Sequence, residues 1–353
     1  MSLPKTMRGA MLIGPEKIAV RNVCVPRPSP GELLLSIEAA TTCGTDVKVY
    51  KRGGHPRMLK TPTLFGHEMT GRVAALGKGV QKFSEGDGVV VANSAPCGAC
   101  TPCNLGHENL CEDLIYINGA FAEFILVPER FVQKNTYHIP KGLSFSKAAM
   151  TEPLACVLHG LDACEFDKHN KNTILDVVIF GAGPIGLLFV AALARKGHRI
   201  ILADPNINRL NVGSELGATK IIKIERGGGQ AGLIREETSE KKGVNIAIDS
   251  SGVPEAWVDA IQSARPGGLI NLFGGCAPGT KIDLDTNLVH YSELTIKGVY
   301  HHRPDTIRRS LKMLSDKNFR ADKILTAVRP IDEVEEALKS MISKEALKVV
   351  ISN

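Results

Sequence analysis

The chain has 353 residues, of which 43% are hydrophobic and 23% charged, and at ~100–200 residues per domain this length predicts two folded domains. Its 43 Lys and Arg against 37 Asp and Glu give a net charge of +6, spread over the chain without a long run of one sign. We therefore exclude disordered, fibrous and disulfide-scaffold classes, and we expect no nucleic-acid partner and no membrane association.

The N-terminal part alternates short apolar runs with Gly and Pro, as at residues 32–38, 71–76 and 88–92. Short strands between turn signals predict a barrel-like β domain. The first nine residues are polar and basic with no apolar segment after them, so we expect no secretory signal and a cytoplasmic location.

From about residue 173 the pattern changes to apolar strands separated by helix-length stretches. This alternation predicts a parallel sheet covered on both faces, that is, a doubly wound Rossmann domain. The expected strands are residues 174–180, 199–203, 220–224, 244–248, 269–273 and 294–299. Two amphipathic helices are expected after them, at residues 306–315 and 332–342.

Residues 177–194 carry no charge and reach the lower length limit of a membrane span, but Gly181, Gly183, Pro184 and Gly186 interrupt their centre. A buried strand, turn and helix explain the run better. The Gly-x-Gly-x-x-Gly spacing directly after a predicted strand is typical of a dinucleotide site, in which a pyrophosphate binds at the helix N-terminus.

Asp204 follows the next predicted strand and is placed to accept hydrogen bonds from an adenosine ribose. A carboxylate at this position repels a 2′-phosphate, so we expect NAD rather than NADP, with Arg209 against the adenosine half. The expected cofactor-binding residues are Gly181, Gly183, Pro184, Ile185, Gly186, Asp204 and Arg209.

Four of the nine cysteines lie within fifteen residues, as Cys97-x2-Cys100-x2-Cys103-x7-Cys111. Four thiolates favour a closed tetrahedral zinc site, because an iron–sulfur cluster of bacterial spacing has a shorter last interval followed by Pro. Reduced thiols without a metal are the remaining alternative. The Pro and Gly residues between the cysteines predict a loop with a structural role.

A second, dispersed set consists of Cys43, His67, Glu68 and Glu152. Each residue alone is a weak signal, since a single Cys, His or Glu usually has a structural place. Together they offer the thiolate, imidazole and carboxylate of a catalytic zinc with one open position.

With these motifs in this order, the chain resembles the zinc-containing medium-chain dehydrogenases of the alcohol, sorbitol and threonine type, on the polyol branch. The resemblance implies a GroES-like catalytic domain at residues 1–155, completed by residues 295–353, and a Rossmann domain at residues 156–294, with the active site in the cleft. It also implies two zinc ions per subunit, one catalytic and one structural, and a homotetramer or homodimer.

The resemblance further implies that Cys43 and His67 hold the catalytic zinc with Glu68 or Glu152, and that Thr45 hydrogen-bonds the substrate oxygen. Lys48 replaces a histidine that carries the proton outward in many members, and its ordinary pKa near 10.4 leaves the relay beyond Thr45 open.

We therefore expect NAD-dependent oxidation of a secondary alcohol of polyol, cyclitol or sugar type to a ketone. Threonine and phosphorylated polyols are alternative substrates. A metal-free quinone or enone reductase and a non-catalytic NAD-binding redox sensor are rivals, but neither needs the cysteine and histidine motifs. The pocket candidates named from motif ends are Tyr50, His55, Arg57, Tyr116, Phe121, Tyr300 and His301. Lys48, His55, Arg57 and Lys60 are crowded between two motifs. They could bind an anionic substrate group, but the sequence favours a solvated loop over an anion-binding site.

Overall fold

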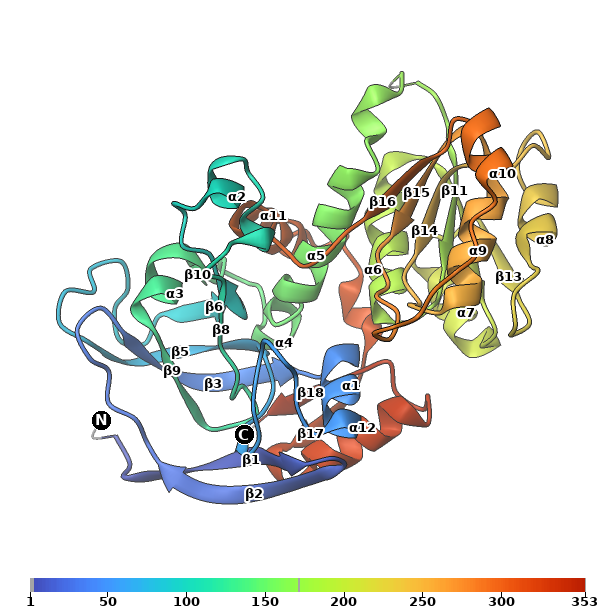
Figure 1. Cartoon of the computed structure of the whole chain (residues 1–353). Coiled ribbons are helices and arrows are strands. Elements are labelled where there is room, and N and C mark those ends of the chain that lie inside the picture. Colours follow the sequence, from blue (N-terminus) through green and yellow to red (C-terminus); the bar gives the residue numbers. More distant parts are fainter. Residues whose placement is uncertain (1–2, 171, 353) are drawn as a thin grey trace. The chain divides into compact units, whose positions relative to one another are not determined.

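The computed structural model describes residues 3–170 and 172–352 (Figure 1). The chain divides into two compact units, unit 1 from Met1–Ala155 with His302–Asn353 and unit 2 from Cys156–His301. Residues 295–301, which the sequence placed in the catalytic domain, fall in unit 2 because strand β16 (Thr295–Gly298) pairs with that unit's sheet.

Unit 1 is built on a seven-stranded sheet in the order β10-β6-β5-β3-β18-β17, with β9 also paired to β3. Its strands are β3 (Leu33–Thr41), β5 (Glu68–Leu76), β6 (Gly88–Val91), β9 (Phe124–Val127), β10 (Thr136–His138), β17 (Leu325–Pro330) and β18 (Lys348–Ser352). The three expected strands of this region are confirmed as β3, β5 and β6. The C-terminal strand β18 therefore lies directly beside β3.

Alternation along β3 explains how the sheet builds its core. Leu33, Leu35 and Ile37 enter one buried cluster, whereas Leu34 points to a second cluster on the other face. Successive side chains of a strand face opposite sides, so one strand serves both clusters.

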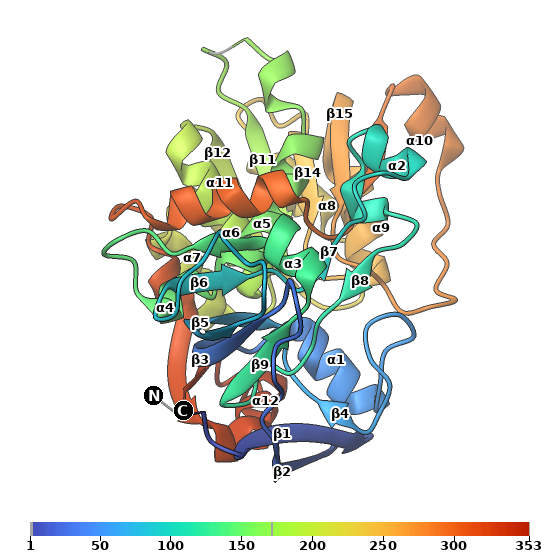
Figure 2. The same cartoon turned by 90° about the vertical axis from the view of Figure 1, so that its left-hand side faces the viewer.

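A smaller sheet completes unit 1, with the order β2-β1-β4. Its strands are β1 (Thr6–Gly14), β2 (Lys17–Cys24) and β4 (Thr63–Leu64), and a separate pair is formed by β7 (Ser94–Ala95) and β8 (Ile115–Tyr116). The helices associated with unit 1 are α1 (Gly44–Arg52), α2 (Thr101–Asn104), α3 (Glu129–Lys134), α4 (Phe145–Ala148), α11 (Pro304–Leu314) and α12 (Val334–Ile342). Figures 1 and 2 show the β1–β2 hairpin next to α12.

Unit 2 is a six-stranded parallel sheet in the order β13-β12-β11-β14-β15-β16. The strands are β11 (Asp176–Phe180), β12 (Arg199–Asp204), β13 (Lys220–Lys223), β14 (Val244–Asp249), β15 (Ala264–Leu272) and β16. The order reverses between β11 and β14, which is the Rossmann arrangement, and ligands of such sheets bind at the carboxyl ends of these strands.

Helices cover both faces of this sheet. They are α6 (Pro184–Leu193), α7 (Ile207–Glu215), α8 (Ala231–Glu236), α9 (Pro254–Ser263) and α10 (Thr286–Tyr291). Helices α6 and α7 pack on β12, whereas α9 packs on β14 and β15. Because parallel crossovers are right-handed, the reversal of strand order at β11 and β14 puts the two groups on opposite faces, as Figure 1 shows for α6 and α9.

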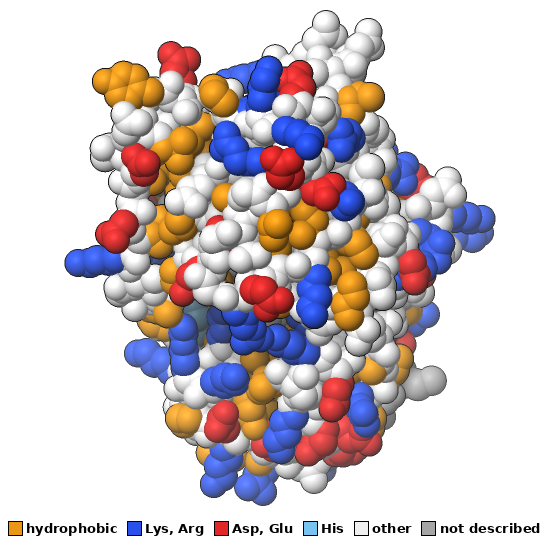
Figure 3. Space-filling model, turned by 90° about the vertical axis from the view of Figure 1, so that its right-hand side faces the viewer, with side chains coloured by type: hydrophobic (Ala, Val, Ile, Leu, Met, Phe, Trp, Pro, Cys, Tyr) orange, Lys and Arg blue, Asp and Glu red, His pale blue; other side chains and the backbone are white. Residues whose placement is uncertain are grey.

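Helix α5 (Thr151–Ala163) contains the chain division between the units. The uncharged run at residues 177–194 is split between β11 and α6. Among the described residues, no helix combines the length and the apolar character that crossing a membrane requires. On the face drawn in Figure 3, acidic and basic side chains are interspersed over much of the surface.

Candidate active site and metal centres

Cys43, His67 and Glu68 bring one sulfur, nitrogen or oxygen ligand atom each into a group whose members lie within 4.8 Å of one another. Cys43 is the N-cap of α1, Glu68 is the first residue of β5, and His67 directly precedes that strand. The register of the sheet explains the meeting, because Thr41, two residues before Cys43, pairs directly with Glu68. Two adjacent antiparallel strands thus deliver all three side chains to one place.

Asp46 orients two members of this group. Its Oδ1 lies 2.8 Å from His67 Nδ1, and its Oδ2 accepts a 2.9 Å hydrogen bond from the Cys43 backbone N–H. A carboxylate only accepts, so Nδ1 carries the proton and Nε2 is left as the ligand atom. Burial lowers the pKa of the His67 imidazole, but the Asp46 carboxylate outweighs it and the pKa is raised well above 6.5.

Glu68 is fully buried, and one of its carboxylate oxygens accepts hydrogen bonds from two different side chains. Its Oε2 accepts hydrogen bonds from Thr41 Oγ1 and from the Lys348 ammonium, which also donates to the Thr42 carbonyl at 2.6 Å. Burial lowers the pKa of Lys348, but Glu68, and then Cys43 and Asp46, raise it, so the pKa is raised overall. The lysine is therefore a buried cation that holds the carboxylate in place.

The other Glu68 oxygen, Oε1, is buried and has no hydrogen-bond partner among the described residues. A buried carboxylate oxygen without a donor is unfavourable unless something positively charged meets it. Together with the thiol of Cys43 and the Nε2 of His67, this oxygen is a donor set that fits zinc.

Glu152, the other predicted carboxylate ligand, opens helix α5 and is not a member of that group. Its Oε1 lies 3.9 Å from His302 Nε2, and burial raises its pKa to about 7, while the charge of His67 acts in the opposite direction. Its charge is thus coupled to His67, although its carboxylate lies outside the 4.8 Å group.

The four clustered cysteines form a second group of ligand atoms within 4.8 Å. Cys97 Sγ lies 4.0 Å from Cys103 Sγ, and Cys100 Sγ lies 3.8 Å from Cys111 Sγ. Four sulfurs at ~2.3 Å from a common centre are about 3.8 Å apart, whereas a disulfide requires ~2.05 Å. The spacing therefore fits a tetrahedral zinc ion, and all four cysteines are free thiols.

Backbone donors shape this segment. The N–H groups of Ala99 and Cys100 point at Cys97 Sγ from 3.4 and 3.3 Å, and they lower the pKa of the Cys97 thiol to about 6. The prediction of a loop throughout is corrected at α2, where Pro102 occupies the first turn of a short helix. Proline is compatible with that turn because its missing N–H has no partner there anyway.

In unit 2, the glycine-rich turn joins β11 to α6. Gly181 has φ +99°, a left-handed conformation that favours glycine, and a Cβ on Gly186 would lie 1.8 Å from the Gly181 carbonyl oxygen. Gly183 faces open space, because a Cβ added there would meet no atom within 4 Å. Gly181 and Gly186 thus allow a tight turn, and Gly183 leaves its backbone accessible. This arrangement fits a pyrophosphate at the N-terminus of α6.

Asp204 ends β12 beside this turn. Its Oδ2 accepts a 2.7 Å hydrogen bond from the Ala182 N–H, and its Oδ1 accepts one of 2.7 Å from the Asn206 N–H. Arg209 is partly buried near it, and its Nε has no hydrogen-bond partner among the described residues. A fixed carboxylate and a partly buried guanidinium therefore flank the turn.

Comparison with known proteins decides the family. Residues 29–140 match the model of the alcohol dehydrogenase GroES-like domain, and residues 184–316 match that of zinc-binding dehydrogenases. The chain is 31% identical to the L-threonine 3-dehydrogenase of Idiomarina loihiensis over 93% of its own length and 94% of the relative's. The chain belongs to the zinc-containing medium-chain dehydrogenase family.

Two further relatives share its full length. The dehydrogenase is 28% identical to the sorbitol dehydrogenase of Bacillus subtilis, covering 99% of this chain and 98% of the relative. It superposes with a TM-score of 0.89 on a protein from Sinorhizobium meliloti 1021 described as a zinc-binding dehydrogenase bound to NADP, at 28% identity, 99% coverage of this chain and 100% of that chain. The family and the fold, GroES-like plus Rossmann, are thus confirmed, and the protein is a zinc-dependent dehydrogenase.

Two of the pocket candidates of this dehydrogenase are corrected by their packing. Tyr50 is buried and donates its hydroxyl hydrogen bond to Glu335 at 2.7 Å, and Phe121 is fully buried against Phe65 and Gly66. Both are core residues, because their aromatic area is covered by their own unit. Lys48 is exposed on α1, one helical turn after the half-buried Thr45.

Sequence reasoning missed Asp46, Thr41 and Lys348 as partners of the candidate ligands. Asp46 lies inside the Cys-Gly-Thr-Asp motif and three residues after the N-cap Cys43, a spacing typical of a capping box, so this signal was available. Lys348 lies 280 residues from Glu68. No local pattern distinguishes it from other lysines, and only the pairing of β18 with β3 brings it to the site.

Proposed function

We propose that this dehydrogenase oxidises a polyhydroxylated secondary alcohol of polyol, cyclitol or sugar type to a ketone, with NAD as cofactor. The observation that carries the proposal is the meeting of Cys43, His67 and Glu68 ligand atoms within 4.8 Å, with a buried carboxylate oxygen lacking any donor among the described residues. Three protein ligands leave a fourth position for substrate.

In this proposal, Cys43, His67 and Glu68 hold the catalytic zinc, with Glu152 as the alternative carboxylate, and the four clustered cysteines hold a structural one. When bound, the metal supplies a Lewis acid that lowers the pKa of the substrate hydroxyl, and the nicotinamide supplies the hydride acceptor. Thr45 Oγ1 accepts the substrate hydroxyl proton and passes it outward, past Lys48, which lies about one helical turn further along α1.

The preference for NAD rests on Asp204. Its two oxygens are aimed by backbone donors, and each keeps a free acceptor site for a ribose hydroxyl. A 2′-phosphate at this place would meet the carboxylate charge. The Sinorhizobium relative was solved with NADP. In this chain the positive charge of Arg209 lies near Asp204 and opposes the repulsion of a 2′-phosphate by that carboxylate.

The substrate class rests on the polarity of the ligand set, since a carboxylate in place of a second thiolate gives a harder, more polar site. The sorbitol dehydrogenase of Bacillus subtilis agrees with a polyol, and the relatives that are threonine dehydrogenases favour threonine as the second candidate. Both candidates carry a secondary alcohol next to a polar group.

A panel of substrates tests the proposal, with reduction of NAD followed by absorbance. Polyols, cyclitols, aldoses, L-threonine, sugar phosphates and simple alkanols are compared by kcat/KM. A sugar alcohol or cyclitol as best substrate supports the proposal, and L-threonine as best substrate selects the second candidate. Fastest turnover of primary alkanols contradicts both.

A further inference from the structure

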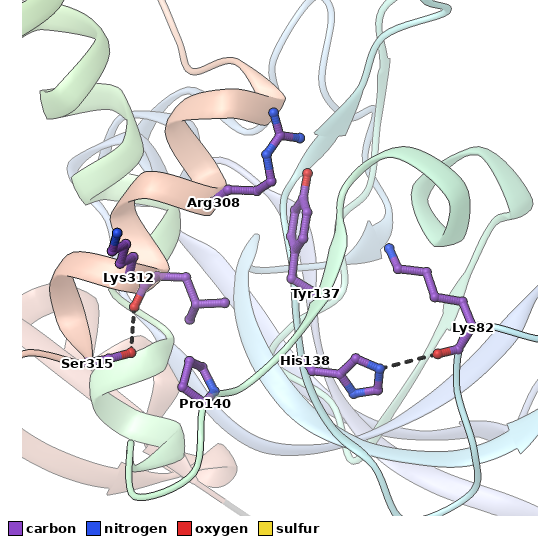
Figure 4. A pocket seen from close by; sticks show the side chains of 8 residues that line it. Lys82, Tyr137, His138, Pro140, Arg308, Lys312 and Ser315 are labelled. Carbon is purple, nitrogen blue, oxygen red and sulfur yellow. Dashed lines mark hydrogen bonds between the residues drawn. The ribbon is translucent and has the colours of Figure 1, made fainter.

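An open cavity of about 480 Å³ lies in unit 1, and none of its lining residues belongs to the ligand groups described above. One wall is the second half of α11 and the other is the end of β10 with its neighbouring loops (Figure 4). Its lining residues are Lys82, Tyr137, His138, Pro140, Arg308, Leu311, Lys312 and Ser315. The volume is within the range of small-molecule sites.

Cations stand on both walls of this cavity. Arg308 and Lys312 are one turn apart on α11, whereas Lys82 belongs to the opposite wall, which His138 also lines (Figure 4). Like charges at this helical spacing repel. Arg308 has a carboxylate at 3.4 Å in Asp305 of its own helix, but the Lys312 ammonium makes no ion pair or hydrogen bond within the described residues.

Lys82 is held in position without a carboxylate partner among the described residues. Its ammonium donates a 2.7 Å hydrogen bond to the Thr136 carbonyl and lies 5.0 Å from the Phe83 ring centre and 5.2 Å from that of Tyr137. Burial lowers its pKa, and the charge of Arg308 lowers it further. Two cations thus act on each other across the cavity, an arrangement that a bound anion would relieve.

The floor between the cations is apolar. The Leu311 side chain is buried, and Pro140 and the ring of Tyr137 complete this surface. Tyr137 is fixed because its ring packs against buried Ala92, Ala155 and Ile307. A ligand that fits must therefore carry an apolar body as well as negative charge.

We propose that this cavity binds a small organic phosphate with an aromatic or apolar body. Arg308 and Lys82 take the phosphate oxygens from the two walls, and Tyr137, Pro140 and Leu311 take the body. A guanidinium suits several oxygens of one phosphate, and an ammonium adds a point charge. None of these residues belongs to the proposed metal or nucleotide sites, so the inference is independent of the proposed function.

Titration calorimetry on the zinc-loaded full chain, with phenyl phosphate as probe, tests the proposal. We expect binding at least ~10-fold tighter than that of inorganic phosphate, and a loss of ~10-fold or more for Lys82→Gln and for Arg308→Gln, since each tenfold step is about 1.4 kcal/mol. Arg309→Gln removes the same charge from the same helix outside the lining and should change the affinity less than ~2-fold. Circular dichroism confirms that each variant is folded.

Four outcomes would overturn the proposal. They are no binding of phenyl phosphate at millimolar concentration, equal affinity for phenyl phosphate and inorganic phosphate, equal weakening by Arg309→Gln, and displacement of phenyl phosphate by NAD. The second shows that the apolar floor is not used. The third shows general charge attraction, and the fourth places the ligand in the nucleotide site.

Discussion

The two candidate metal centres of this dehydrogenase are assembled in opposite ways. The four-cysteine group comes from one segment of fifteen residues, whereas the Cys43, His67 and Glu68 group depends on the pairing of β3 with β5 and, through Lys348, of β3 with β18. The first joins ligands that are already close together in the sequence. The second is linked to three strands of the sheet, so its geometry is fixed by the whole of unit 1.

The two centres also differ in the kinds of ligand atom they offer and in the residues that hydrogen-bond to them. All four ligands of the local centre are thiols grouped at tetrahedral spacing, a closed arrangement. The dispersed centre has mixed ligands, a Glu68 oxygen that is buried without a donor among the described residues, and ligand residues oriented by Asp46 and Lys348. Residues that orient a metal ligand also tune the affinity and activity of the metal it holds.

The largest expected effect is on turnover, from His67→Ala. Losing several kcal/mol of transition-state stabilisation by the metal should lower kcat/KM by ~1,000-fold or more, because each tenfold step is about 1.4 kcal/mol. The thermal unfolding curve should show that the variant remains folded. Activity within tenfold of the parent protein would remove His67 from the catalytic centre.

The four-cysteine centre should show the reverse pattern in Cys100→Ser. We expect a loss of about 4 kcal/mol in unfolding free energy, or roughly 8–16 °C in Tm, since loss of a structural metal is among the largest single-residue effects. Turnover per folded molecule should stay near that of the parent. Ala99→Ser, in the same loop, is the control and should leave Tm unchanged.

Lys348→Met tests the long-range partner of Glu68. Removing one member of a buried pair leaves the other charge uncompensated, which costs about 3 kcal/mol or more. We expect the double variant Lys348→Met with Glu68→Gln to recover part of this stability. If denaturant unfolding shows the double variant to be no more stable than the single one, the ion pair does not explain the burial of Lys348.

The smallest expected effect is on cofactor choice, from Asp204→Ser. Removing the carboxylate should narrow the preference for NAD over NADP by ~10-fold to 100-fold, or about 1.4–2.8 kcal/mol. The ratio of the two kcat/KM values measures it, with Asn208→Ser as a nearby control. Equal use of both cofactors by the unmodified enzyme would contradict this account of Asp204.

Elements with a continuous local pattern were predictable from the sequence. The apolar run at residues 174–180 became β11, and the expected sixth strand became β16. The start of β15 was placed five residues late, at 269 rather than Ala264, because Pro266, Gly267 and Gly268 resemble a turn. They belong instead to an irregular strand start, where the register with β14 shifts.

The sequence predicted the candidate ligands of the site but not the hydrogen bonds and ion pairs that hold them in place. Spacing indicated the four cysteines, and the motifs Cys43-Gly44-Thr45-Asp46 and Gly66-His67-Glu68 indicated the dispersed candidate ligands. Spacing did not decide between Glu68 and Glu152, since that choice depends on sheet register and helix position. Lys348 could not be predicted as a partner of Glu68, because the local sequence does not indicate which distant strands pair.

Zinc stoichiometry followed together with activity during stepwise chelation tests the central claim most directly. The account predicts two zinc ions per chain, one at the four cysteines and one at Cys43, His67 and Glu68. The first to leave should take the activity with it at constant Tm, and the second should lower Tm. Freshly prepared active enzyme with one zinc ion or none, or activity that survives until the last ion leaves, would contradict the assignment of a catalytic and a structural centre.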